Sequence, residues 1–248
     1  MSALQGRNEI NGKIYRAVRD MVITAKQGFV EVSAMDVLKH IAFNLNYKVE
    51  TIEEGPLPVG DIETLEKFLE RFSPSDTVEV STFENKIIIE RASPYKKASL
   101  PAASLEAIAS KDNPVMAKLK QKPDGFYELG KSSYNLKFTL NVEDIQRIIE
   151  DGDLVQQRVY PWHIKDKTLF VSVGSTTYGQ IETAVPLEGV TPEQCPEVKT
   201  AFSAGIDNLF GSLAGKVSLQ LAAEFSPLIV EQSTDKYGYL AVLVPYKE

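Results

Sequence analysis

One pattern constrains the fold of this chain more than any other: an amphipathic helix followed by strand-like runs, which occurs twice. Residues 201–213 place large apolar side chains on one helical face, namely Phe202, Ile206, Leu209, Phe210 and Leu213. Three runs with strand character follow within residues 216–244. Residues 59–91 repeat the first part of this order, so the chain is predicted to contain two copies of one module.

Chain length is compatible with this division. A chain of 248 residues can form one large domain or two domains of ordinary size, and the repeat favours two. We predict a first module in residues 1–100, an interdomain linker in residues 101–133 and a second module in residues 134–248. A connection this long is unusual inside a compact domain, so the linker is predicted to bridge the modules or to act as a functional loop.

Composition argues against several classes of protein. The chain has no apolar run near the roughly 20 residues that span a membrane, and its first residues lack the pattern of a secretory signal. A single cysteine, Cys195, cannot form an internal disulfide, and we predict a cytoplasmic protein, or a nuclear one if the source has a nucleus. The net charge of −7 opposes binding to nucleic acid unless the lysines and arginines gather on one face.

The predicted helices carry basic residues away from their apolar stripes. These helices are expected in residues 11–24, 61–72 and 142–151. The basic residues outside the stripes are Lys13, Arg16, Arg19, Lys67, Arg71 and Arg147. Taken alone, the pattern is explained most simply by a solvated helix face.

No catalytic constellation is visible in the sequence. The chain has two histidines, His40 and His163, and lacks a glycine-rich phosphate loop, a nucleophile elbow and a metal-spaced pair of cysteines or histidines. The acidic run in residues 150–153 lacks the alternating ligands of a calcium loop. We therefore expect a protein that is not an enzyme and that holds no metal or other cofactor.

Four segments, together with the repeated module and the long linker, resemble the DNA sliding clamps, the family of proliferating cell nuclear antigen and its archaeal and phage relatives. The first segment is GFVEVSAMD in residues 28–36, followed by His40. The others are NVEDIQR in residues 141–147, FSPLIVE in residues 225–231 and YLAVLVP in residues 239–245. The resemblance covers nearly the whole chain.

The resemblance implies an α+β clamp fold, with two modules that place helices on one face of curved antiparallel sheets. Three chains are expected to close a ring through head-to-tail contacts. The ring is expected to encircle duplex DNA without regard to sequence, with the six basic residues above facing the DNA. The contacting edges are expected in residues 95–100 of one chain and 169–174 of the next, with Tyr95, Leu100, Leu169, Val171 and Val173 as interface residues.

The family also binds a DNA polymerase, a clamp loader and other replication or repair proteins, and it does so through short peptide motifs. Each motif, with a glutamine, an aliphatic residue and paired aromatic residues, enters an apolar pocket beneath the linker. By resemblance, the pocket residues here are Met35, His40, Val115, Met116, Leu119, Pro227, Val242, Leu243 and Pro245. Ordinary core packing is the alternative explanation for the apolar members of this set.

Two other functions stay open at this stage. The chain could be a clamp-like subunit of a heteromeric ring or a scaffold that does not encircle DNA as a homotrimer. It could also be a β-rich enzyme with a dispersed active site, which a deep pocket with paired ionisable groups would indicate.

Overall fold

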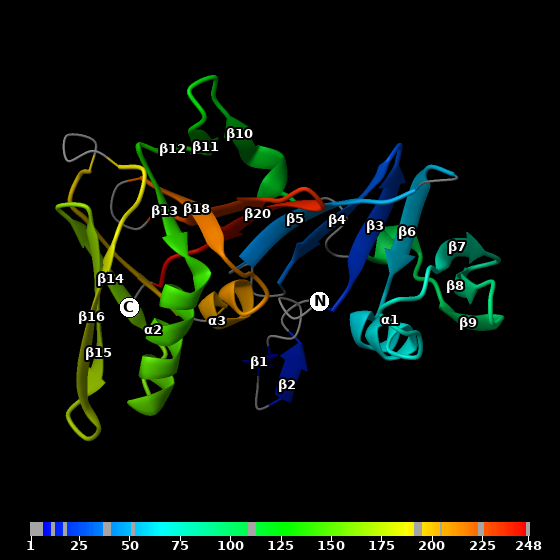
Figure 1. The fold of residues 1–248 in the computed structure, drawn as a ribbon, viewed down its shortest axis with the longest axis horizontal. Coiled ribbons are helices and arrows are strands. Elements are labelled where there is room, and N and C mark those ends of the chain that lie inside the picture. The colour runs from blue at the N-terminus through cyan, green and yellow to red at the C-terminus, as the bar shows by residue number, and fades with distance from the viewer. Residues whose placement is uncertain are drawn as a thin grey trace.

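The computed structural model describes residues 7–10, 13–16, 19–36, 41–50, 53–108, 113–190, 195–203, 205–222 and 226–246. Its largest element is an eight-stranded antiparallel sheet that runs through both modules (Figure 1). In spatial order, its strands are β13 (Leu136–Asn141), β18 (Lys216–Leu221), β19 (Leu228–Ser233), β20 (Tyr237–Leu243), β5 (Ile41–Lys48), β4 (Phe29–Met35), β3 (Met21–Lys26) and β6 (Gly55–Val59). The two modules join where β20 pairs with β5 from Tyr237 opposite Tyr47 to Leu243 opposite Ile41.

Two smaller sheets lie at opposite ends of the long axis in Figure 1. One is four-stranded, in the order β16 (Gly179–Pro186), β15 (Thr168–Ser175), β14 (Tyr160–Lys165) and β17 (Val198–Phe202). The other is three-stranded, in the order β7 (Glu79–Phe83), β8 (Lys86–Arg91) and β9 (Lys96–Pro101). A hairpin of β1 (Arg7–Ile10) and β2 (Lys13–Arg16) precedes β3.

The helices lie on one side of the large sheet and the linker lies on the other (Figure 1). The helices are α1 (Ile62–Leu69), α2 (Val142–Leu154) and α3 (Ile206–Phe210). The linker contains the short 3-10 helices η2 (Leu105–Ala107) and η3 (Met116–Lys118) and the strands β10 (Leu119–Gln121), β11 (Tyr127–Leu129) and β12 (Ser132–Ser133). No helix in the described ranges is long and apolar enough to cross a membrane.

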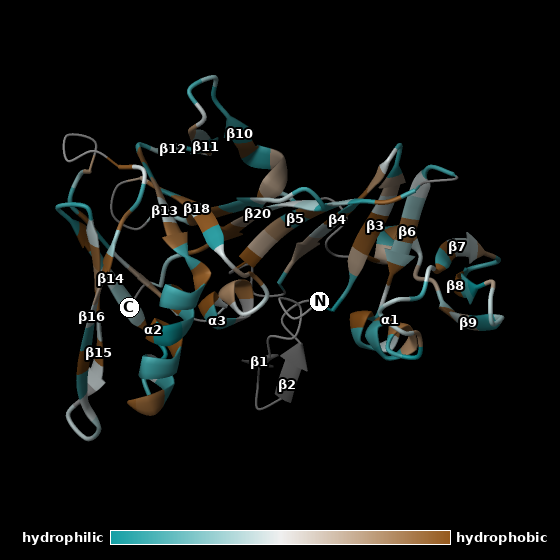
Figure 2. Cartoon of the chain, in the orientation of Figure 1, coloured by the Kyte–Doolittle hydropathy of each residue, from teal (hydrophilic) through white to brown (hydrophobic). Residues whose placement is uncertain are grey.

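Strand β13 alternates between buried and half-buried residues, as a strand with one fully buried face does. On β13, Leu136, Phe138 and Leu140 are buried on the helix side, where Ile145 and Ile148 of α2 belong to the same core. Figure 2 shows that α2 is likewise two-sided, with hydrophilic residues on the face that points away from the sheet. Burial of one such isoleucine or leucine side chain contributes about 1.5–3 kcal/mol, so the apolar stripe holds α2 to the sheet.

Two local features follow from the residue types at their positions. Asp61 caps α1, because its carboxylate accepts the backbone N–H groups of Glu63 at 3.0 Å and Thr64 at 3.3 Å. The turn between β7 and β8 places Glu84 and Asn85 at positive φ, as a two-residue hairpin requires.

The prediction of a helix over residues 11–24 is wrong. The structure has β2 and then β3 in this segment, and β3 forms hydrogen bonds with β4 on one side and β6 on the other. Its successive β-branched residues Val22, Ile23 and Thr24 lose side-chain freedom in a helix and pack well in a sheet. The helix over residues 201–213 is also shorter than predicted, because β17 extends to Phe202 and Gly205 has a φ of 98° before α3 begins.

Candidate interaction surfaces

The helix side of the large sheet carries some of the predicted DNA-binding residues. Lys67 in α1 is exposed and forms an ion pair with Glu63 across 2.7 Å. Arg147 in α2 is exposed, with Asp144 at 3.6 Å. Exposed ion pairs such as these contribute about 1 kcal/mol or less, so the closely spaced row of phosphates in a nucleic acid can compete for both cations.

The other four predicted residues lie elsewhere in the first module. Lys13 and Arg16 lie on β2, Arg19 is exposed just before β3, and Arg71 is exposed just after α1. The carbonyl oxygen of Arg71 accepts a hydrogen bond from the Lys96 ammonium group. The helical placement expected for the first three residues is not observed, and contact of all six residues with DNA stays a prediction.

Acidic side chains surround Arg147 on α2. They are Glu143, Asp144, Glu150, Asp151 and Asp153. Like charges repel a polyanion, so the helix side of the second module offers weak attraction to phosphate.

Each small sheet has two edge strands, β7 and β9 in one sheet and β16 and β17 in the other, and the two sheets lie at opposite ends of the molecule. The prediction that residues 169–174 form the free edge is wrong, because β15 pairs with β14 and β16. Leu169, Val171 and Val173 are buried on this interior strand. At the other end, Tyr95 is exposed beside β9, whereas Leu100 is buried within it.

Large apolar side chains are exposed at both of these ends. Leu154 is 72% exposed at the end of α2, which packs against β15 and β16, and Tyr178 is 53% exposed in the turn between those strands. Figure 2 shows the very end of α2 as hydrophobic. At the opposite end, Phe83 on β7 is 61% exposed and Tyr95 is 69% exposed. Exposed apolar groups of this size beside an unpaired strand edge are typical of a surface that another chain covers.

The linker side of the large sheet holds a separate apolar cluster. Its buried members are Ala42, Met116, Tyr127, Tyr134, Ala222, Ile229 and Val242, and partly buried residues packed against it are Met35, Val115, Leu119, Phe126, Leu129 and Leu240. Five residues predicted to line a pocket therefore meet here: Met35, Val115, Met116, Leu119 and Val242. Linker residues Val115, Met116, Leu119, Phe126, Tyr127 and Leu129 therefore pack on this side of the sheet.

The remaining predicted pocket residues have different positions. Leu243 does not belong to the cluster, because successive residues of a strand point to opposite faces and Val242 already faces the linker. Pro227 is half-buried at the border, where its carbonyl oxygen accepts a hydrogen bond from Tyr134 at 2.9 Å. Pro245 is buried just beyond β20, and His40 lies outside the described residues.

Buried polar side chains fasten the linker to the sheet, and the sequence-based prediction missed them. Asn113 donates to the Ala34 carbonyl oxygen at 3.0 Å and to Ser33 Oγ at 3.1 Å, and its Oδ1 accepts from Met116 N at 3.3 Å. Gln220 on β18 accepts from Tyr127 N at 3.0 Å and donates to the Gly125 carbonyl oxygen at 3.1 Å. The linker is therefore held at both ends of η3–β11 by satisfied, buried amides.

Tyrosines complete the attachment. The Tyr127 hydroxyl donates to Glu231 at 3.4 Å, and burial together with this carboxylate raises the pKa of Tyr127 to about 12. The sequence alone does not identify Gln220 as buried. Alternation in residues 217–221 places it on the side opposite Leu219 and Leu221, and its amide is buried there only because the linker covers it.

Replacing Asn113 with Ala is expected to loosen the linker while leaving the sheets folded. The change leaves the buried carbonyl of Ala34 without its side-chain donor, which costs about 1–3 kcal/mol. Hydrogen exchange at Met116 and Leu119 should accelerate by at least tenfold, and Asn135→Ala at an exposed position should leave it unchanged. Unchanged exchange in Asn113→Ala would contradict the anchoring role.

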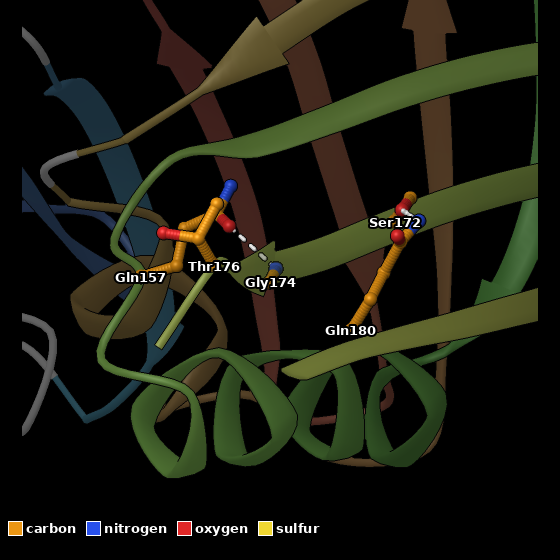
Figure 3. Close-up of a pocket in the computed structure, with 5 residues that line it drawn as sticks. All are labelled: Gln157, Ser172, Gly174, Thr176 and Gln180. Atoms are coloured by element: carbon orange, nitrogen blue, oxygen red, sulfur yellow. Dashed lines mark hydrogen bonds between the residues drawn. The ribbon is translucent and has the colours of Figure 1, made fainter. Parts of the chain in front are cut away.

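A shallow pocket of about 440 Å³ lies beside the hairpin of β15 and β16 (Figure 3). It is lined by Gln157, Ser172, Gly174, Thr176 and Gln180, and Gln180 donates to Ser172 Oγ at 2.7 Å. None of these lining residues is an acid or a base. Within the described residues, no group of three histidine, cysteine, aspartate or glutamate side chains could hold a metal ion.

Comparison with known proteins supports a clamp fold. No family model matches the sequence, and no curated protein is significantly similar to it. The structure resembles that of proliferating cell nuclear antigen (PCNA) from Entamoeba histolytica, with a TM-score of 0.70, 14% identity, and coverage of 93% of this chain and 91% of that one. It resembles PCNA from Thermococcus kodakaraensis with a TM-score of 0.67, 15% identity, and coverage of 92% and 91%.

A third similar structure is A. fulgidus PCNA bound to the C-terminal region of FEN-1. It matches with a TM-score of 0.70, 13% identity, and coverage of 93% of this chain and 90% of that one. The present chain therefore has the PCNA-like sliding-clamp fold, as its sequence resemblance predicted.

Proposed function

We propose that this chain is a DNA sliding clamp, a ring-shaped processivity factor without catalytic activity of its own. Three copies close head to tail, encircle duplex DNA and tether a polymerase and other DNA-processing proteins. The observation that carries the proposal is the clamp fold combined with unpaired edges, β9 and β16, at opposite ends of one molecule. A heterologous contact between such edges repeats around a rotation axis and can close.

In this ring, β9 of one copy extends the sheet that ends at β16 of the next copy. The pairing joins the two small sheets into one. It is favourable because it gives hydrogen-bond partners to backbone N–H and C=O groups that face solvent in the single chain. Leu154 and Tyr178 of one copy meet the apolar residues around Tyr95 of its neighbour. Covering these side chains provides the hydrophobic part of the association free energy.

The helices then face the hole, with Lys67 and Arg147 near the DNA. A topological link holds the ring on DNA, so its contacts with phosphate need little affinity and permit sliding. This accommodates both the net charge of −7 and the acidic side chains of α2. Partner proteins bind on the opposite side, where the apolar cluster lies beneath the linker.

A heteromeric ring is the second candidate. The acidic surface of α2 favours it, since a homotrimer places three copies of this helix around the DNA. A ring in which another chain supplies basic helices would attract DNA more strongly. In this case the purified chain alone should not form a trimer.

Threading onto tethered DNA tests the proposed function without a clamp loader. The protein is incubated with linear duplex DNA that is fixed at one end, the free end is then blocked, and the DNA is washed in 0.5 M salt. We expect the protein to remain until a nuclease cuts the DNA, because salt screens phosphate contacts but leaves a topological link intact. DNA with its free end blocked beforehand is the control, and loss of the protein during the wash would contradict encirclement.

A further inference from the structure

The second part of the linker, residues 113–133, carries positive charge in an acidic protein. Residues 113–133 contain four lysines and two acidic residues, a net charge of +2, whereas the whole chain has a net charge of −7. The lysines are Lys118, Lys120, Lys122 and Lys131. Figure 2 shows β10 as hydrophilic where the linker projects from the sheet.

Three of these lysines are open to a partner. Lys118, Lys120 and Lys131 are exposed, and among the described residues none of them forms an ion pair. Lys122 is less exposed and lies 3.7 Å from Asp124. Lys120 lies opposite Glu128 in the pairing of β10 with β11, which offsets part of its charge, whereas Lys118 and Lys131 lie outside the paired residues.

These lysines flank the accessible part of the apolar cluster. Leu119 and Leu129 lie opposite each other on β10 and β11, and both are only half-buried. Lys118 and Lys120 adjoin Leu119 on one strand, and Lys131 follows Leu129 by two residues on the other. Successive residues of a strand point to opposite faces, so Lys120 lies on the face of β10 opposite Leu119. A segment that contacts the leucine pair therefore has exposed lysines next to it along the chain, although not on the leucine face itself.

We propose that the linker surface selects partner peptides whose apolar anchor is flanked by aspartate or glutamate residues. This inference rests on the proposed function, because it takes the cluster beneath the linker as the partner site. The lysines contribute attraction at the flanks, while the apolar cluster provides the contact for the anchor. Charge complementarity of this kind sets partner choice and association rate.

A peptide fits the surface better than a nucleic acid does. The half-buried side chains of Val115, Leu119, Phe126 and Leu129 lie among the lysines and favour an apolar anchor. Asp124 and Glu128 interrupt the positive charge that a continuous phosphate backbone would need. The linker also lies on the side of the sheet opposite the helices (Figure 1).

Three synthetic peptides test the proposal by fluorescence anisotropy at 20 mM salt. They share one anchor of a glutamine, an aliphatic residue and two aromatic residues, and they differ only in flanks of three Asp, three Ser or three Lys residues. The Asp-flanked peptide should bind about tenfold more tightly than the Ser-flanked one, and the Lys-flanked peptide should bind most weakly. The differences should vanish at 1 M salt, where the screening length is about 3 Å.

Charge reversal identifies the lysines. The variant K118E/K120E/K131E should reverse the order of the three peptides, while the control K48E/K165E/K236E changes three exposed lysines outside the linker and should preserve it. A preference of the unchanged protein for the Asp-flanked peptide points to the linker lysines, because the overall net charge of −7 would by itself favour the Lys-flanked peptide.

Each other outcome overturns the inference in a recognisable way. Equal affinities at low salt, or an order of affinities that K118E/K120E/K131E does not change, would contradict the proposed charge selectivity. Neither result would contradict the partner site beneath the linker. Failure of all three peptides to bind would contradict the proposed partner site itself. If a 30-base-pair duplex binds and loses affinity in K118E/K120E/K131E while the peptides do not, the lysines serve nucleic acid instead.

Discussion

Replacing Leu154 and Tyr178 with Asp should convert a trimer of this chain into folded monomers. Both side chains are more than half exposed in the single chain, so their loss leaves the core intact. In a closed ring they lie at each junction, where truncating a central apolar residue costs about 2 kcal/mol or more. Two such changes weaken each junction by about 4 kcal/mol, close to a thousandfold in affinity.

Light scattering measures this outcome directly. The unchanged protein should have three times the chain mass of 27.5 kDa, and the double variant should have the chain mass alone. The matched control replaces Tyr47 and Val244, which are exposed away from the two unpaired edges, and should remain trimeric. A double variant that stays trimeric would place the junction elsewhere, whereas a monomeric unchanged protein would favour the heteromeric ring.

Replacing Gly205 with Ala should destabilise the chain by about 3 kcal/mol. The residue has a φ of 98°, and an added Cβ would lie 2.5 Å from Ile41 Cδ1 and 2.8 Å from Ile41 Cγ1. The left-handed backbone costs an alanine about 1–2 kcal/mol, and crowding in a packed core adds about 1–3 kcal/mol. Ile41 belongs to the first module and Gly205 to the second, so the variant also reports on how tightly the modules are joined.

Urea unfolding of Gly205→Ala and Gly215→Ala separates the two contributions. Gly215 has a φ of 70°, but an added Cβ would meet no atom within 4 Å. The control should therefore lose only the backbone component, about 1 kcal/mol. If the two variants are equally stable, Ile41 yields without cost and the contact between the modules is loose.

Much of the sheet architecture could be predicted from residue order. The alternation of Leu136, Phe138 and Leu140 is typical of a strand with one buried face, as β13 is. The apolar stripe of Ile145 and Ile148 fits the helix predicted over residues 142–151, which is α2. The first module was harder. Residues 11–24 satisfy a helical spacing and also contain a β-branched run, and only the hydrogen bonds to β4 and β6 decide between the two.

The candidate surfaces could be predicted only in part. Met35, Met116 and Val242 were brought together by resemblance, and the structure places them in one cluster. Leu243 was assigned to the same set because a motif does not specify which face of a strand each residue occupies. Asn113 and Gln220 were missed, since a buried amide is recognised only when the chain that covers it is known.

Continuous pairing between β20 and β5 gives each chain the mechanics of a stiff arc. Seven residue pairs, from Tyr237 with Tyr47 to Leu243 with Ile41, must separate before the modules can hinge apart. In the proposed ring, bending is therefore expected at the junctions between copies, where β9 is proposed to pair with β16. A protein that opens the ring needs to break one of these junctions. Because each chain is stiff, force applied at any point of the chain is transmitted to its junctions.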